Sequence, residues 1–302
     1  MSCDRLSSKY DQKKLTKMGL GDIKSILLRN RYFIQLRYSS FFIKLFAFLR
    51  PAWKKELQEQ KKYYLKFFNH LKPGQHTSFD IGANEGFVTG FFLQFGFSVI
   101  AVEPDQRNIA ILIRRFRTNG RFQLYSGAAG QSNGTGKIYL QKNGTAFSTL
   151  SSKWKELIEL GSYRFHSPYG PQPETVKMIT LDELIETYGM PSYIKIDVEG
   201  YEAEVIKGLN KKVPILLFEA NLPQFMNETL DCLKKLNQID ENAIFNYSYS
   251  FTIESEGFSR YDEFIKILAA ISHPCIDIIC IMSNYFDYYT GLPIIKSELS
   301  FE

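Results

Sequence analysis

The chain of 302 residues is 44% hydrophobic and 23% charged, which is the balance of an ordinary globular protein. Its net charge of +5 is unevenly spread, because residues 1–72 carry 17 Lys and Arg against 5 Asp and Glu, or +12, and the remainder carries −7. The basic segment suits contact with phosphate, on a membrane surface or a nucleic acid, but a solvated helical face explains it at least as well.

The cysteines and the apolar runs argue against a zinc-binding, a secreted or a membrane-spanning protein. The four cysteines form no C-x-x-C pair and have no histidine at zinc-ligand spacing, which favours reduced thiols in a cytoplasmic setting. We expect no secretory signal. The longest apolar run, residues 33–49, is interrupted by Arg37 and Lys44 and falls short of the roughly 20 residues of a membrane span. An amphipathic helix at a membrane interface remains open there, although packing on the main domain is favoured.

Two helices are expected before the main domain. They cover residues 31–49 and 52–70, and Pro51 separates them. The dipeptide Pro73-Gly74 then breaks the chain. We therefore predict a basic, aromatic-rich helical extension over residues 1–74 and one domain over residues 75–302.

From His76 onward, apolar stretches that suit strands alternate with stretches of helical spacing. We expect strands at His76–Gly82, Ser98–Pro104, Phe122–Ala129, Gly136–Gln141, Val176–Ile179, Tyr193–Val198, Ile215–Glu219, Ala243–Ile253 and Cys275–Met282. We expect helices at Phe87–Gly96, Arg107–Gly120, Leu181–Tyr188, Glu202–Leu209, Pro223–Ile239 and Tyr261–Ile271. This order predicts an α/β fold, with a mainly parallel, Rossmann-like sheet covered by helices on both faces. Residues 143–175 look irregular and are a candidate substrate lid.

The first strand ends in the turn Asp80-Ile-Gly-Ala-Asn-Glu-Gly, where a ligand of an open α/β sheet is expected. Gly82 would let the backbone approach that ligand closely. Glu103 follows 21 residues later, at the end of the next strand, and suits the ribose hydroxyls of a nucleoside, which its two oxygens would accept.

The turn argues against a dinucleotide. A pyrophosphate-binding turn needs G-x-G-x-x-G, and Asn84 occupies the place of its middle glycine. Asp80 and Glu85 would repel phosphate but would suit an amino group and a sulfonium cation. The charges therefore favour S-adenosylmethionine over NAD.

Four segments resemble the FkbM family of S-adenosylmethionine-dependent methyltransferases. They are Asp80-Ile-Gly-Ala-Asn-Glu-Gly, Val102-Glu103-Pro104-Asp105, Thr180-Leu-Asp-Glu-Leu and Ile194-Lys-Ile-Asp-Val-Glu-Gly-Tyr-Glu. The resemblance runs from about Thr77 to Asn221, and K-I-D-V-E-G is its most specific part. It implies a seven-stranded methyltransferase sheet and methylation of an oxygen on a sugar or natural product.

The predicted site gathers these residues at the carboxyl ends of the strands. For the cofactor we predict Asp80, Gly82, Asn84, Glu103, Pro104, Ala129 and Asp197. For catalysis we predict Asp197, Glu199 and Glu219, because a hydroxyl acceptor must be aligned with the methyl group and lose its proton. Lys195, two residues before Asp197, could pair with one of these acids.

Several alternatives stay open. Asp197 and a neighbour could hold a divalent cation, although the spacing requires none, or Lys195, Asp197 and Glu199 could only brace the sheet. His166 in the candidate lid could be a base or merely exposed. The chain could be an inactive, methyltransferase-like binding protein or, less favoured, an NAD-dependent oxidoreductase. A saccharide, glycolipid or natural product fits as acceptor; nucleic acid is disfavoured, because no known nucleic-acid module is present.

Overall fold

The computed structural model describes residues 51–68, 74, 76–142, 144–161, 168–254 and 257–288. The chain divides into two compact units, Met1–Lys54 and Lys55–Glu302. Of the first unit only the beginning of helix α5 (Pro51–Phe68) is described. The helix expected at residues 31–49, with its candidate interfacial run at 33–49, and the candidate base His166 lie outside the described residues.

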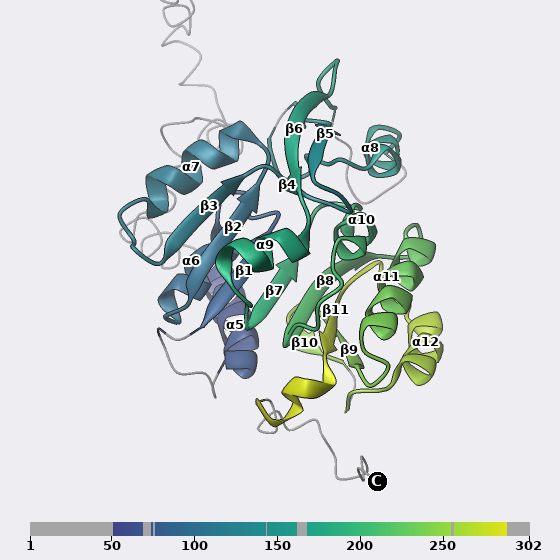
Figure 1. Cartoon of the computed structure of the whole chain (residues 1–302). Helices are drawn as coiled ribbons and strands as arrows, with labels where there is room; N and C mark the ends of the chain where they lie inside the picture. Colours follow the sequence, from purple (N-terminus) through teal and green to yellow (C-terminus); the bar gives the residue numbers. More distant parts are fainter. Residues whose placement is uncertain are drawn as a thin grey trace, which may run out of the picture. The chain divides into compact units, whose positions relative to one another are not determined.

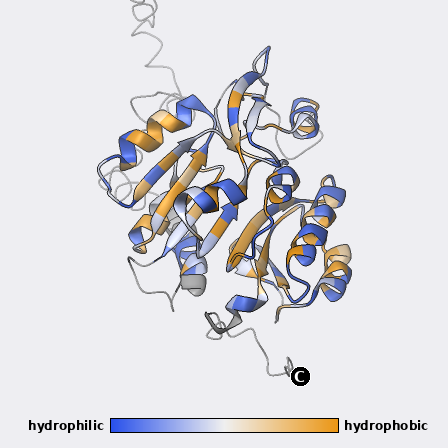
Figure 2. Cartoon of the chain, viewed as in Figure 1, coloured by the Kyte–Doolittle hydropathy of each residue, from blue (hydrophilic) through white to orange (hydrophobic). Residues whose placement is uncertain are grey.

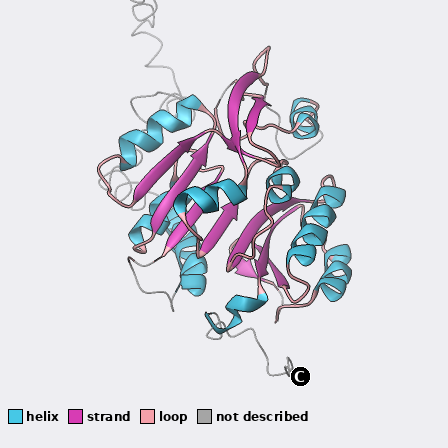
Figure 3. Cartoon of the chain, in the orientation of Figure 1, coloured by secondary structure: helices cyan, strands magenta, loops and turns pink. Residues whose placement is uncertain are grey.

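An eight-stranded sheet forms the centre of the second unit (Figures 1 and 3). Its strands are β1 (Thr77–Ile81), β2 (Ser98–Glu103), β3 (Phe122–Ser126), β7 (Tyr193–Ile196), β8 (Ile215–Asn221), β9 (Ile244–Tyr249), β10 (Thr252–Ile253) and β11 (Cys275–Ile281). Their order across the sheet is β10-β9-β11-β8-β7-β1-β2-β3. The α/β prediction is confirmed, but the expected count of seven is wrong, because the strand expected at Ala243–Ile253 folds into the antiparallel hairpin β9-β10.

The strand order reverses at β1. The neighbours β8, β7, β1, β2 and β3 pair in parallel, and β11 runs antiparallel to both β8 and β9. The chain first moves outward from β1 to β2 and β3, and later returns to place β7 on the other side of β1. Such a switch point leaves room for a ligand beyond the carboxyl ends of the strands.

Helices cover both faces of this sheet, which explains why its central strands carry many apolar residues (Figure 2). Buried side chains of four helices pack with one face: α9 (Leu181–Tyr188), α10 (Glu202–Lys207), α11 (Met226–Ile239) and α12 (Tyr261–Ala270). Three others pack with the opposite face: α5, α6 (Phe87–Gln94) and α7 (Gln106–Phe116). Tyr63 and Tyr64 bring α5 into the core, at exposed fractions of 1% and 3%.

A small second sheet departs from the sequence prediction. Its order is β4-β6-β5, formed by β4 (Ala128–Ala129), β5 (Gly134–Ile138) and β6 (Glu174–Ile179). The strand expected at Phe122–Ala129 is therefore wrong as one element, because β3 ends before Gly127. A Cβ at Gly127 would lie 2.8 Å from the carbonyl oxygen of Lys177, so glycine permits this close crossing onto β6.

The described part of the candidate lid, residues 144–161 and 168–175, is not irregular throughout, although the sequence indicates that it is. It contains helix α8 (Ser152–Glu159), whose first turn is capped by the Ser151 hydroxyl accepting from the Trp154 amide at 3.1 Å. Trp154 and Ile158 are buried against Tyr169 and Phe225. After β11 the described chain ends in a short 3-10 helix, η1 (Ser283–Tyr288).

Two further observations concern the described residues only. None of their helices combines the length and the apolar character that a bilayer span requires. Cys232, Cys275 and Cys280 are free thiols.

Candidate cofactor and active site

The turns after β1 and β7 touch at Gly82. Gly82 has φ +79°, and a Cβ on it would overlap the carbonyl oxygen of Asp197 and lie 2.9 Å from its carbonyl carbon. We expected the glycine to make room for a ligand, but its requirement comes from the backbone of the β7 turn. The contact brings the first predicted motif and the K-I-D-V-E-G segment into one site.

Asp80 is fully buried on β1, beneath that turn. Thr89 Oγ1 donates to its Oδ2 at 2.6 Å, and its Oδ1 has no hydrogen-bond partner within the described residues. Burial raises the pKa of Asp80, and the nearby Lys195 ammonium opposes that rise. A buried carboxylate oxygen without a donor is costly, and a ligand's donor would satisfy it.

Glu103 closes β2 and is already engaged by the protein. Its Oε2 accepts from the Asn84 amide at 2.7 Å, and its Oε1 accepts from the Asp105 amide at 2.9 Å and from Asn108 Nδ2 at 3.3 Å. Burial raises its pKa to about 7. A carboxylate offers about four acceptor positions, so one on Oε2 stays open. Glu103 can therefore accept a ligand hydroxyl through Oε2 alone, and not through both oxygens as the sequence suggests.

Asn84 is placed by backbone geometry. Its φ of 49° is in the left-handed region, which asparagine tolerates better than most residues. In this conformation the Asn84 amide donates a hydrogen bond to Glu103. The Asn84 side-chain oxygen, Oδ1, accepts from the Glu85 amide at 2.7 Å and from Thr145 Oγ1 at 3.4 Å. Asn84 thereby joins the cofactor turn to the segment before α8.

The two other predicted cofactor residues are less directly placed. Pro104 precedes Asp105, whose carboxylate caps α7 by accepting from the Arg107 amide at 2.9 Å. Ala129 lies in β4, paired with Ile179, and its side chain is buried in the core. Contact of either residue with a cofactor stays a prediction.

These groups fit S-adenosylmethionine. The unpartnered Asp80 oxygen, the open position on Glu103 and the half-buried Asp197 are all carboxylates, which suit a ligand that brings an amino group, a sulfonium and ribose hydroxyls. No glycine occupies position 84, where a pyrophosphate would need one.

A row of charged side chains continues across the sheet from Asp80. Lys195 is its neighbour on β7, and Lys195 Nζ binds Asp197 Oδ2 at 2.7 Å, as the sequence spacing suggested. Burial lowers the pKa of Lys195, but the carboxylates of Asp197 and Asp80 together hold it above its usual value. Lys195 is therefore the cation of an otherwise acidic row.

The acids Glu219 and Asp277 face each other on β8 and β11. They are register partners in the β8–β11 pair. In the β7–β8 pair Ile196 is the partner of Phe218, so the next residues, Asp197 and Glu219, lie side by side at the strand ends. Burial, followed by the charges of Asp197 and Asp277, raises the pKa of Glu219 to about 8. Burial likewise raises the pKa of Asp277 to about 7. Both side chains remain half-buried, so solvent reaches them.

Glu199 lies in the turn after β7. Its φ is 56°, and its carbonyl oxygen accepts from Thr149 Oγ1 at 2.7 Å. Burial, then the charges of Glu219 and Asp197, hold the pKa of Glu199 well above its usual value. The three predicted catalytic acids are therefore close enough to influence each other's charge.

Several residues of this site were missed from the sequence. Asp277 carried a signal, since it is the single charge in the apolar run Cys275–Met282. Glu202 also carried one, as an acid next to the glycine turn; its Oε1 accepts from the Val198 amide at 3.1 Å and the Gly200 amide at 3.3 Å. Thr149 had no signal, because it reaches Glu199 from 50 residues away in the chain.

Metal ligation was tested on the described residues. Within the ranges that the structure describes, no three or more His, Cys, Asp or Glu side chains are arranged to hold a metal ion.

Comparisons with known proteins complete this picture. A family model described as "Methyltransferase FkbM domain" matches residues 80–251, which is more than half of the chain. A search of curated proteins found no match.

Solved structures that resemble the chain share little sequence with it. A precorrin-6y C5,15-methyltransferase from Geobacter metallireducens is 9% identical, with a TM-score of 0.38 over 73% of this chain and 87% of that one. A TehB-like SAM-dependent methyltransferase from Corynebacterium glutamicum is 8% identical, with a TM-score of 0.38 over 74% and 88%. Such scores add no weight, so the assignment rests on the domain match together with the fitting carboxylates. The chain belongs to the FkbM methyltransferase family, and its cofactor is S-adenosylmethionine.

Proposed function

We propose that the protein methylates an oxygen, namely a hydroxyl group on a saccharide, glycolipid or natural product. Asp80, Asn84 and Glu103 would hold the cofactor, with Asp197 between cofactor and acceptor. When bound, S-adenosylmethionine supplies an electrophilic methyl group. The residues of the chain must orient the acceptor toward it and remove the hydroxyl proton.

The observation that supports oxygen as the acceptor atom is the raised pKa of Glu219. A base works best when its pKa lies near the working pH, and burial with its acidic neighbours brings Glu219 to about 8. Asp197 is less suited to this step, because its Oδ2 is already engaged by Lys195 Nζ at 2.7 Å. We therefore assign proton removal to Glu219 and orientation of the acceptor to Asp197 and Glu199.

The charge of the site limits the classes of acceptor that can bind there. Asp197, Glu199, Glu219 and Asp277 face one lysine among the described residues, so a phosphorylated group placed against them would be repelled. A neutral hydroxyl, or one beside an amino group, is favoured, and nucleic acid is disfavoured.

Transfer of a labelled methyl group tests this function. The protein is incubated with methyl-labelled S-adenosylmethionine and three sets of acceptors: neutral saccharides, amino sugars and sugar phosphates. We expect label on a hydroxyl oxygen of the first two sets, located by mass spectrometry. Glu219→Gln should abolish transfer, whereas Glu186→Gln, which removes an exposed acid on α9, should not. Label on nitrogen or carbon would refute O-methylation, and cofactor binding with no transfer to any set would favour an inactive binding protein.

Other expectations remain proposals. We propose that residues 1–74 are an extension whose last helix, α5, packs on the domain of residues 75–302. We also propose a cytoplasmic location and membrane contact through the basic segment, most of which lies outside the described residues. Assistance by a divalent cation would appear as loss of transfer with a chelator.

A further inference from the structure

We infer that Thr149 is a positioning residue that holds the Glu199 turn, a role that rests on the proposed assignment of Glu199 to the active site. Among the described residues, non-glycine positions with positive φ are Asn84, Glu199, Ser250 and Phe251. Residues other than glycine rarely have a positive φ, and such conformations persist only where the surrounding structure enforces them. The backbone at Glu199 therefore needs a partner that fixes it.

The Thr149 hydroxyl supplies that partner. Its Oγ1 donates to the carbonyl oxygen of Glu199 at 2.7 Å and accepts from the Ser151 amide at 2.9 Å. Thr149 is only 1% exposed, so water does not compete for this bond. From the other side, Glu202 accepts from the amides that flank Glu199. The turn is thus held by two side chains, Thr149 at the Glu199 carbonyl and Glu202 at the amides before and after it.

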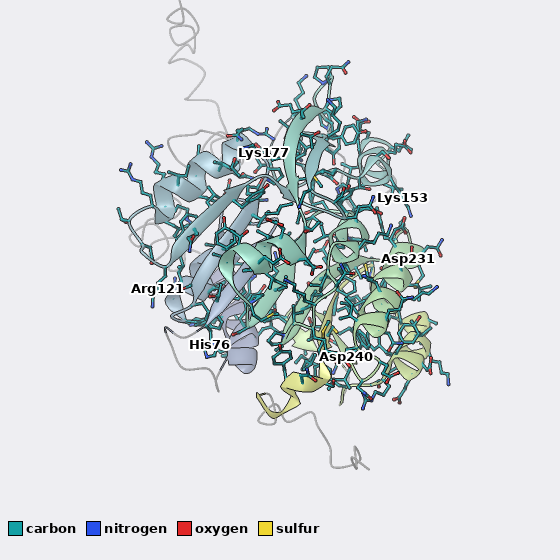
Figure 4. All side chains as sticks on the ribbon, viewed as in Figure 1. His76, Arg121, Lys153, Lys177, Asp231 and Asp240 are labelled. Atoms are coloured by element: carbon teal, nitrogen blue, oxygen red, sulfur yellow. The ribbon has the colours of Figure 1, made fainter. Side chains whose placement is uncertain are left out.

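Thr149 is itself fixed from both directions along the chain. It exchanges two backbone hydrogen bonds with Tyr139, at 2.7 and 3.0 Å. Ser151 then caps α8, which is anchored on α11 by the ion pair of Lys153 with Glu228 at 2.6 Å (Figure 4 labels Lys153). This anchoring makes the hydroxyl a fixed support for the turn.

Aromatic packing closes the remaining space around the turn. A Cβ on Gly200 would lie 2.8 Å from the Phe225 ring and 3.1 Å from Trp154 Cβ. The rings of Trp154 and Phe225 pack on each other with their centroids 5.8 Å apart. This packing restricts movement of the turn at Gly200, next to Glu199.

Fixing the backbone fixes the surroundings of the Glu199 carboxyl. The charged and titratable groups that act on it come from four elements: Glu219 on β8, Lys195 on β7 and Asp197 at its end, Glu202 on α10, and Tyr169 before β6. Without the Thr149 hydroxyl, the Glu199 carbonyl loses its side-chain partner and only Glu202 still holds the turn, so Glu199 can return to negative φ. Its side chain would then leave the acidic row, and its pKa would move toward the ordinary value of a glutamate.

The test follows the titration of Glu199 in the full chain and needs no acceptor. Protein with ¹³C-labelled glutamate carboxyls is titrated by NMR, and Glu199→Gln identifies the Glu199 signal. In Thr149→Val we expect the midpoint of the Glu199 titration to fall by about one pH unit or more. In Thr149→Ser, which keeps the hydroxyl, we expect this midpoint to stay at the wild-type value. If Thr149→Val does not fold, Thr149→Cys, with its weaker S–H donor, should show a smaller fall.

The matched control is Thr229→Val. Thr229 is also buried, and its Oγ1 donates at 2.8 Å to the carbonyl oxygen of Phe225, the residue that precedes α11, so this bond is made to the backbone at the start of α11 and not to Glu199. Its loss should lower stability without moving the Glu199 midpoint. An unchanged midpoint in Thr149→Val or Thr149→Cys, or an equal fall in Thr229→Val, would overturn the inference. Calorimetric titration of wild type with S-adenosylmethionine separates the two claims, because absent binding refutes the proposed function whatever the midpoints show.

Discussion

Replacing Gly82 by alanine tests the contact between the two turns of the site. The new Cβ would overlap the Asp197 carbonyl oxygen and lie 3.2 Å from Val198 Cγ1. The obstacle is backbone, so it cannot move aside by a rotamer change. Either the β1 turn or the β7 turn must shift, and each carries predicted cofactor residues.

The expected loss of stability has two parts. A residue with a Cβ at φ +79° costs about 1–2 kcal/mol. Displacing packed backbone adds about 1–3 kcal/mol, as overpacking usually does. The sum of about 2–5 kcal/mol corresponds to a fall in Tm centred near about 10 °C for a domain of this size.

Gly74→Ala separates these parts. Gly74 has a similar φ of +84°, but a Cβ there would meet nothing within 4 Å. Its replacement carries the conformational cost alone, so its Tm should fall by about half as much. The difference between the two variants measures the overlap with Asp197.

Differential scanning calorimetry and titration with S-adenosylmethionine make the comparison. We expect Gly82→Ala to melt about 5 °C below Gly74→Ala and to lose cofactor affinity, while Gly74→Ala binds as wild type. Equal melting temperatures with unchanged affinity in Gly82→Ala would refute the proposed contact.

Three further predictions concern the acids. The raised pKa of Asp277 means that the folded state holds a proton that the unfolded state releases, so this group's contribution to stability is lost as pH rises from about 4 to about 7. The shift is equivalent to about 4 kcal/mol, which solvent screening of the half-buried side chain reduces to about 2 kcal/mol. Asp277→Asn should therefore gain about 2 kcal/mol at pH 8 and little at pH 4 by thermal unfolding, and no gain at pH 8 would contradict the reasoning. Glu103→Gln should raise the Kd for S-adenosylmethionine by about tenfold or more in calorimetry, and an unchanged Kd would remove Glu103 from the cofactor site. Asp197→Asn should keep that Kd within about threefold of wild type while labelled-methyl transfer falls by about a hundredfold, and undiminished transfer would exclude Asp197 from catalysis.

Local patterns were sufficient for much of the fold and part of the site. Apolar runs such as Tyr193–Ile196 identify buried parallel strands whatever their neighbours are. Acids that follow those runs, such as Glu103 and Asp197, gather at one edge because parallel strands end together. The Lys195–Asp197 pair also followed from spacing, since alternate residues of a strand share a face.

What the sequence did not predict depends on contacts between distant segments. Gly127 lies close to the backbone of Lys177 where β3 ends and β4 begins, and neither residue alone predicts this contact. Asp277 joins the site only because β11 inserts between β8 and β9. Thr149 acts on Glu199 through a contact that the chain order does not reveal.

Binding of S-adenosylmethionine is the most direct test of the central claim. Calorimetric titration of the full chain with S-adenosylmethionine and, separately, with NADH compares a cationic cofactor with a pyrophosphate. We predict saturable binding of S-adenosylmethionine, weakened in Glu103→Gln, and none of NADH. Binding of NADH, or no binding of S-adenosylmethionine, would contradict the account.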